Sequence, residues 1–202
     1  MNERPSRSVC LGLRARTARA IAIVVSGTAQ SPCAIARAEI TLGNPDSPAL
    51  FGPYHGVMHL PWNEAVVAVQ GAERAIETVA THSLEAYLRD LRKQDIEVTR
   101  VAVVGAPERK LETMGSPHIR AHAAEGVLFR RVWQVAAAAI GVPSVAFAEK
   151  GFEAHAALRL ELTVGALRDH LTEFGRAMGH PWRSDEKAAA MAAWLTLGTG
   201  SA

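Results

Sequence analysis

The chain has 202 residues, of which 49% are hydrophobic and 21% are charged. This length suits one domain, and this composition allows a substantial core and excludes wholesale disorder. The formal net charge of +2 is below that of a typical nucleic-acid-binding domain, and no apolar run is long enough to cross a membrane. We therefore expect a single domain over residues 1–202, located in the cytoplasm and without contact to a membrane.

The first third of the chain predicts strands and a long loop. Residues 8–27 end in a β-branched run and indicate one long strand or two short strands in series. Turn residues follow at 27–31, and a second strand is expected at 33–42. Prolines and glycines mark residues 43–61 as a loop, with a short third strand at 56–60.

Two side-chain features of this region carry expectations of their own. A hairpin that turns at 27–31 would set Cys33 opposite a residue near Val24, so we expect no disulfide with Cys10 and a reducing compartment. Tyr54 and His55 are interpreted as part of a surface turn in the loop, and the alternative is that they line a pocket.

The remainder of the chain alternates between helical and strand patterns. Apolar residues recur every three or four positions from 62 to 94, which predicts a long amphipathic helix. Ser116 and Pro117 predict the start of another helix, as N-cap and first helical residue. The expected elements after residue 94 are a strand at 98–105, a helix at 117–140, a strand at 143–149, and helices at 151–160, 163–178 and 184–197.

This order of elements predicts an α/β protein. A meander of three strands with its loop (8–61) is followed by two helix-strand crossovers and C-terminal helices (62–202). Such an order gives a mixed five-stranded sheet with helices on both faces. It is the layout of the three-layer ribonuclease H-like fold.

Two stretches resemble a family with this fold. LGLRARTARAIAIVV (11–25) resembles the opening strand of the RuvC family of Holliday-junction resolvases, and SDEKAAAMAAWLTL (184–197) resembles its last helix. HIRAHAAEGVLFR (118–130) and GHPWRSDEKAAAMAAW (179–194) also resemble stretches of an uncharacterised bacterial protein family, which brings no known activity.

The resolvase resemblance implies a site of carboxylates that hold two divalent metal ions. It implies one acid in the first strand, one at the end of the fourth strand, and one at the start of the last helix. Here the first strand carries Arg14 and Arg16, and the fourth strand ends at Gly105. Only the last helix keeps acids, Asp185 and Glu186, so we expect a degenerate site in a pseudoenzyme.

The arginines and the remaining acids lead to a specific hypothesis. We expect Arg14 or Arg16 to pair with Asp185 or Glu186, where a metal would otherwise sit. The alternative is that both acids only oppose the dipole in the first turn of their helix.

Other polar residues are candidates for a site. His118, His122 and Glu125 share one helix face and could bind a metal ion, or they could form a hydrogen-bonded polar patch. The candidate catalytic acids are Glu125, Glu149 and Asp185. The candidate binding residues are Arg14, Arg16, Arg130, Lys150 and Lys187.

Two functions remain open on this basis. The first is a catalytically degenerate domain that binds nucleic acid or another protein and is not an active nuclease. The alternative is a metal-dependent hydrolase or nuclease with relocated ligands, drawn from the histidines and acids above. No cofactor is expected beyond a possible divalent metal, and the sequence predicts no particular oligomeric state.

Overall fold

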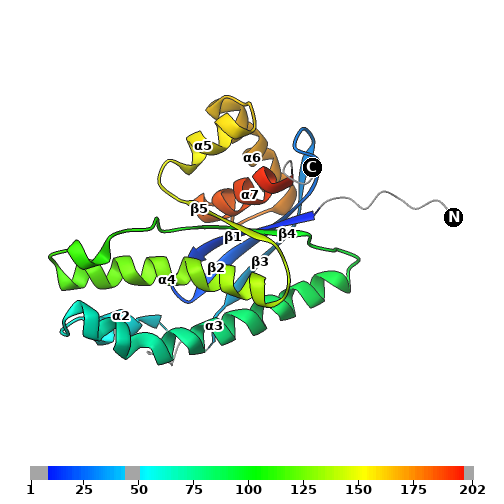
Figure 1. Ribbon diagram of the computed structural model, residues 1–202. Helices are drawn as coiled ribbons and strands as arrows, with labels where there is room; N and C mark the ends of the chain where they lie inside the picture. Colours follow the sequence, from blue (N-terminus) through cyan, green and yellow to red (C-terminus); the bar gives the residue numbers. More distant parts are fainter. Residues whose placement is uncertain (1–8, 44–50, 198–202) are drawn as a thin grey trace.

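The computed structural model describes residues 9–43 and 51–197. Its centre is one five-stranded sheet with the strand order β3-β2-β1-β4-β5 (Figure 1). An antiparallel meander is formed by β1 (Val9–Arg16), β2 (Arg19–Gly27) and β3 (Pro32–Thr41). On the other side of β1, the strands run parallel: β4 (Arg100–Gly105) pairs with β1, and β5 (Ser144–Ala148) pairs with β4. The predicted mixed sheet and the ribonuclease H-like order are confirmed.

Helices cover both faces of this sheet, as the sequence predicts (Figure 1). One face carries α3 (Trp62–Arg92) and α4 (Pro117–Ala139), whose apolar residues share a core with Leu11 and Leu13. The opposite face carries α5 (Phe152–Arg159), α6 (Val164–Met178) and α7 (Ser184–Leu197). A 3-10 turn, η1 (Leu111–Thr113), lies between β4 and α4. None of the helices in the described ranges is long and apolar enough to cross a membrane.

The start of the chain differs from the prediction. Residues 8–27 hold neither one long strand nor two strands in series, because β1 and β2 form a hairpin that turns at Thr17 and Ala18. Ala18 adopts a positive φ of 55°, and its carbonyl accepts a hydrogen bond from the Leu42 amide at 2.8 Å. Alanine rarely takes this conformation, and tight hairpin turns usually contain glycine or asparagine. Because this turn contains neither, its sequence does not predict a hairpin.

The predicted strand at 56–60 is also wrong. The chain there forms the short helix α2 (Pro53–Gly56) and a turn, and Tyr54 is buried with its hydroxyl bonded to Glu73 at 2.9 Å. Part of the expected loop, residues 44–50, lies outside the described residues.

The two cysteines are free, as expected. Cys33 pairs across the sheet with Ser26, close to the predicted position, while Cys10 pairs with Val25. Burial raises the pKa of the Cys10 thiol, which keeps it uncharged and unreactive.

Helix α7 lies in direct backbone contact with β1. A Cβ atom placed on Gly12 would lie 1.8 Å from the carbonyl oxygen of Ala189, closer than any real contact. Ala189, Ala190, Ala192 and Ala193 are all fully buried, so this helix approaches the sheet on small side chains. The contact fixes where the first turn of α7 lies relative to β1.

This contact predicts that Gly12→Ala destabilises the protein strongly. The new methyl group meets backbone, which cannot rotate away, so we expect a loss of about 3 kcal/mol, at the upper end of overpacking effects. The matched control is Gly71→Ala, because Gly71 is exposed within α3 with no atom within 4 Å of an added Cβ. It should gain about 0.5–1 kcal/mol. Urea unfolding of both variants measures the difference, and equal stabilities would refute the close contact.

Candidate functional site

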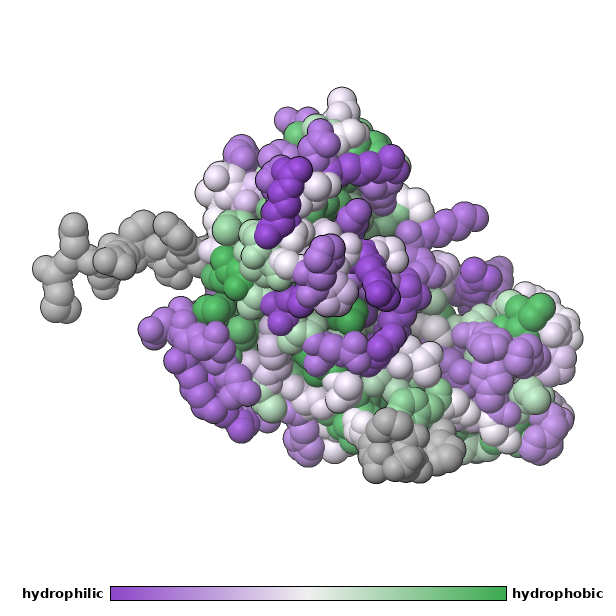
Figure 2. Space-filling view, turned by 180° about the vertical axis from the view of Figure 1, so that it is seen from behind, coloured by the Kyte–Doolittle hydropathy of each residue, from purple (hydrophilic) through white to green (hydrophobic). Residues whose placement is uncertain are grey.

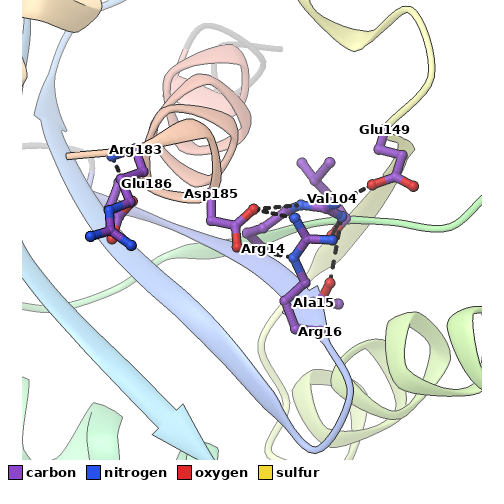
Figure 3. A network of polar contacts seen from close by, with 8 residues as sticks. All are labelled: Arg14, Ala15, Arg16, Val104, Glu149, Arg183, Asp185 and Glu186. Atoms are coloured by element: carbon purple, nitrogen blue, oxygen red, sulfur yellow. Dashed lines mark hydrogen bonds and ion pairs between the residues drawn. The ribbon is translucent and has the colours of Figure 1, made fainter. Parts of the chain in front are cut away.

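Arg14 forms the centre of a polar cluster at the end of β1. Its side chain is almost fully buried, with the residue 5% exposed. The guanidinium donates a hydrogen bond to the carboxylate of Glu149 and another, from Nη1, to the carbonyl oxygen of Val104 at 3.4 Å (Figure 3). Its Nε lies 3.5 Å from Oδ1 of Asp185. The buried positive charge is thus surrounded by two carboxylates and by the carbonyls of Val104 and Ala15, which offsets its loss of hydration.

Arg16 holds Asp185 from the side nearer the solvent. Its Nε and Nη2 donate to the two carboxylate oxygens of Asp185 at 2.9 Å and 2.5 Å, in the bidentate geometry that a guanidinium favours. The hydrogen bonds from Arg16 lower the pKa of Asp185, although burial opposes them. The same hydrogen bonds raise the pKa of Arg16. The predicted pairing of these arginines with an acid of the last helix is confirmed for Asp185.

Glu186 plays a different part from its neighbour. Its Oε2 accepts a hydrogen bond from the backbone N–H of Arg183 at 2.8 Å, and the residue is buried. This contact is half of a capping box, in which a carboxylate satisfies a backbone donor at the start of a helix. Glu186 therefore does not pair with Arg14 or Arg16 in the hydrogen bonds described, and it acts at the start of its own helix, as the alternative interpretation stated.

Three separate elements supply the cluster around Arg14. Arg14 and Arg16 alternate with Leu13 and Ala15 along β1 and so face α7 rather than α4. Glu149 directly follows β5, and Asp185 lies in the first turn of α7. Parallel strands end at the same edge of a sheet, and this brings the carboxylates to the tip of β1.

The end of β4 contributes no acid to this cluster. Gly105 ends the strand, and an added Cβ there would lie 2.8 Å from the Cβ of Arg130. Arg130 is itself buried and donates a hydrogen bond to Glu108. Arg130, a predicted binding residue, is therefore engaged within the protein.

The donor chemistry of the cluster decides which ions it could hold. Divalent cations such as Mg²⁺ require several converging oxygen ligands, whereas a guanidinium has no lone pair and repels a cation. The carboxylates of Glu149 and Asp185 are each engaged by arginine. As arranged here, these residues do not fit a pair of divalent metal ions.

The predicted metal ligands on α4 form a second, separate cluster. His118 and His122 lie with their Nε2 atoms 3.2 Å apart. Glu125 is buried. Its Oε2 pairs with Nδ1 of His55 at 2.8 Å, and its Oε1 accepts from the His55 amide at 3.0 Å. The interpretation of His55 as a surface turn residue is wrong, because this contact ties it to α4.

The two remaining predicted binding residues are close in sequence to members of the Arg14 cluster. Lys150 follows Glu149 and is exposed, and Lys187 is exposed in the first turn of α7. Arg183, which the sequence did not single out, is exposed just before the same helix. A binding role for Lys150 and Lys187 stays a prediction.

Comparisons with known proteins bear on the fold. No protein-family model matches the chain, and no curated protein sequence matches it. Among solved structures, it is similar to RuvC of Thermus thermophilus, with 14% identity, a TM-score of 0.49, and coverage of 93% of this chain and 92% of that chain. A structure of T. thermophilus RuvC in complex with a Holliday junction substrate gives 15% identity, a TM-score of 0.47, and coverage of 93% and 91%. This likeness concerns the fold and carries over no activity.

The pairing with Arg16 predicts that Asp185→Asn lowers the free energy of unfolding by about 1 kcal/mol at neutral pH, as for other partly exposed ion pairs. Because folding lowers the pKa of Asp185, its contribution is complete above the pKa of an unfolded aspartate. It is then lost as the pH falls through the folded pKa. The difference between wild type and variant should therefore vanish in acid.

Urea unfolding from neutral pH down to the acid limit of the native state measures this difference. Asp169→Asn, at an exposed position on α6, is the control and should show no such pH-dependent difference. A difference for Asp185→Asn that stays constant across the pH range would contradict the ion pair.

Proposed function

We propose that this protein is a ribonuclease H-like domain that binds nucleic acid without cutting it. The observation that carries the proposal is the buried guanidinium of Arg14 between Glu149 and Asp185. It stands where a nuclease of this fold would gather carboxylates around metal ions. The alternative is that the surface around this cluster binds another protein.

The energetics of Arg14 support the absence of metal-dependent cleavage. A divalent ion could enter the cluster only by displacing a buried guanidinium that already has four acceptors. Removing one partner of a buried charge pair leaves the other uncompensated, at a cost of about 3–5 kcal/mol. A metal ion would have to overcome this cost as well as the repulsion from Arg14 and Arg16.

The charges around the cluster support binding to a polyanion. Lys150, Arg183 and Lys187 are exposed and lie within two positions of Glu149 or Asp185 in the chain, and the side chain of Arg16 is 43% exposed. Exposed cations of this kind contact phosphate groups without requiring a particular base. Hydrophilic side chains are prominent in the middle of the face seen in Figure 2, with apolar side chains between and beside them.

The alternative of a hydrolase with relocated ligands would require its histidines and acids to converge. Glu149 and Asp185 contact Arg14, on the side of the sheet covered by α7. Glu125 contacts His55 and belongs to α4, which covers the opposite face. Because these residues lie on opposite faces of the sheet, their positions do not favour a single catalytic centre.

The first test concerns cleavage. Purified protein incubated with branched DNA and Mg²⁺ or Mn²⁺ should leave the DNA intact, because Arg14 keeps the ions from the carboxylates. The melting temperature should also be unchanged by millimolar Mg²⁺, since an ion that binds the folded state would raise it. Cleavage that needs a divalent ion and disappears in Asp185→Asn would overturn the proposal.

The second test concerns binding. Replacing Lys150, Arg183 and Lys187 together by alanine should weaken DNA binding at low salt. The slope of log affinity against log salt should fall by about 1 for each side chain that contacts a phosphate. Fluorescence anisotropy with labelled branched and single-stranded DNA measures both quantities.

The matched control removes three exposed charges elsewhere. These belong to the end of α3 and the residue after it: Arg89, Arg92 and Lys93. Their replacement by alanine should leave the salt slope unchanged. Equal losses in both triple variants would mean that net charge alone attracts DNA. If the protein does not bind DNA even at low salt, the proposed binding of nucleic acid is wrong, and binding to another protein is the function that remains.

A further inference from the structure

Three histidine rings converge at the start of α4. A ring nitrogen from each of His55, His118 and His122 lies within 4.8 Å of the others. The ring centroids are 4.3 Å apart for His55 and His122, 4.5 Å for His118 and His122, and 5.2 Å for His55 and His118. The rings meet nearly edge to face, at 74° to 83°. The nitrogen atoms of the three rings are therefore close enough to one another to share one ion.

The spacing matches the coordination of a small metal ion. Two imidazole nitrogens bound at 2.0–2.1 Å to a tetrahedral ion lie about 3.3 Å apart. The Nε2 atoms of His118 and His122 lie 3.2 Å apart. This pair is four residues apart on one helix and needs no rearrangement of the backbone to share an ion.

The helix that carries this pair has a well-fixed start. Ser116 caps α4 by accepting a hydrogen bond from the Ile119 amide at 3.4 Å, and Pro117 is the first helical residue. The backbone under His118 and His122 is therefore ordered before any ion binds, which lowers the cost of forming a site.

Glu125 positions the third histidine. Its two carboxylate oxygens bind His55 at two points, the amide nitrogen and Nδ1. A carboxylate accepts the proton of Nδ1, and in a neutral imidazole that donates from Nδ1 the lone pair is on Nε2. Histidines that bind metals almost always donate their other ring N–H to a carboxylate or carbonyl in this way. Glu125 is 5% exposed, so this contact is built into the core rather than formed on the surface.

We propose that His55, His118 and His122 bind one divalent transition-metal ion of the Zn²⁺ type, with Glu125 as the positioning residue for His55. Three imidazoles suit Zn²⁺ and its neighbours in the transition series and not Mg²⁺ or Ca²⁺, which prefer oxygen. His118 and His122 are exposed, so the fourth coordination position faces the solvent. An ion held there keeps room for water or an anionic ligand. This site does not depend on the proposed binding of nucleic acid.

Calorimetric titration of the full chain with Zn²⁺ alone, after removal of any affinity tag, tests the site. One ion should bind per chain, and millimolar Mg²⁺ should not compete. His118→Ala and His122→Ala should each weaken binding at least 100-fold. Glu125→Gln should weaken it about 10–100-fold, as for other residues that orient a metal-bound histidine.

His82→Ala is the matched control, because His82 is an exposed histidine on the helix α3. It should bind Zn²⁺ as the wild type does. Circular dichroism of the metal-free variants checks folding. His118 and His122 are exposed, so their variants keep the test valid if Glu125→Gln does not fold. Absence of stoichiometric Zn²⁺ binding, or equal loss in His82→Ala and His122→Ala, would overturn the proposal in favour of a hydrogen-bonded patch.

Discussion

Helix α7 can lie against β1 because Gly12 has no side chain to hold the two backbones apart. The carbonyl of Ala189 occupies the space that a Cβ on Gly12 would need. The rest of the cluster depends on this contact, since it sets the first turn of α7 beside the tip of β1. From that position Asp185 reaches both Arg14 and Arg16, and a thicker layer between helix and strand would separate them. Packing of small residues thus decides the electrostatics of the strand ends.

Several parts of the fold could be predicted from the sequence. Periodicity located the helices and strands after residue 62 to within two residues, because their ends carry clear signals. Ser116 and Pro117 begin α4, and Gly141 follows its end with a φ of 74°. The pairing of arginine with Asp185 was also predictable, because the resemblance to the RuvC family implies a shared site for the first strand and the start of the last helix.

The features that escaped prediction depend on contacts between distant segments. The hairpin at Thr17 and Ala18 contains no glycine, proline or asparagine. The carbonyl of Ala18 accepts a hydrogen bond from Leu42, which follows β3. His55 lies in a segment rich in proline and glycine, and its partner is Glu125, 70 positions later. The sequence placed Glu125 among the metal ligands because it shares a face with His118 and His122. Its actual partner lies on another element, which helical spacing cannot reveal.

Two buried charges of opposite sign give the two clusters opposite chemistry. Arg14 and Glu125 are each 5% exposed, so each needs partners within the protein. Arg14 meets two carboxylates and two carbonyls, which complete its environment. Glu125 meets the amide and the imidazole of His55, and no ion pair joins it to an arginine or lysine among the described residues. A cation on the far side of that ring would complete the balance. On this electrostatic ground, we propose that the strand ends disfavour metal ions and that the histidines on the other face of the sheet bind one.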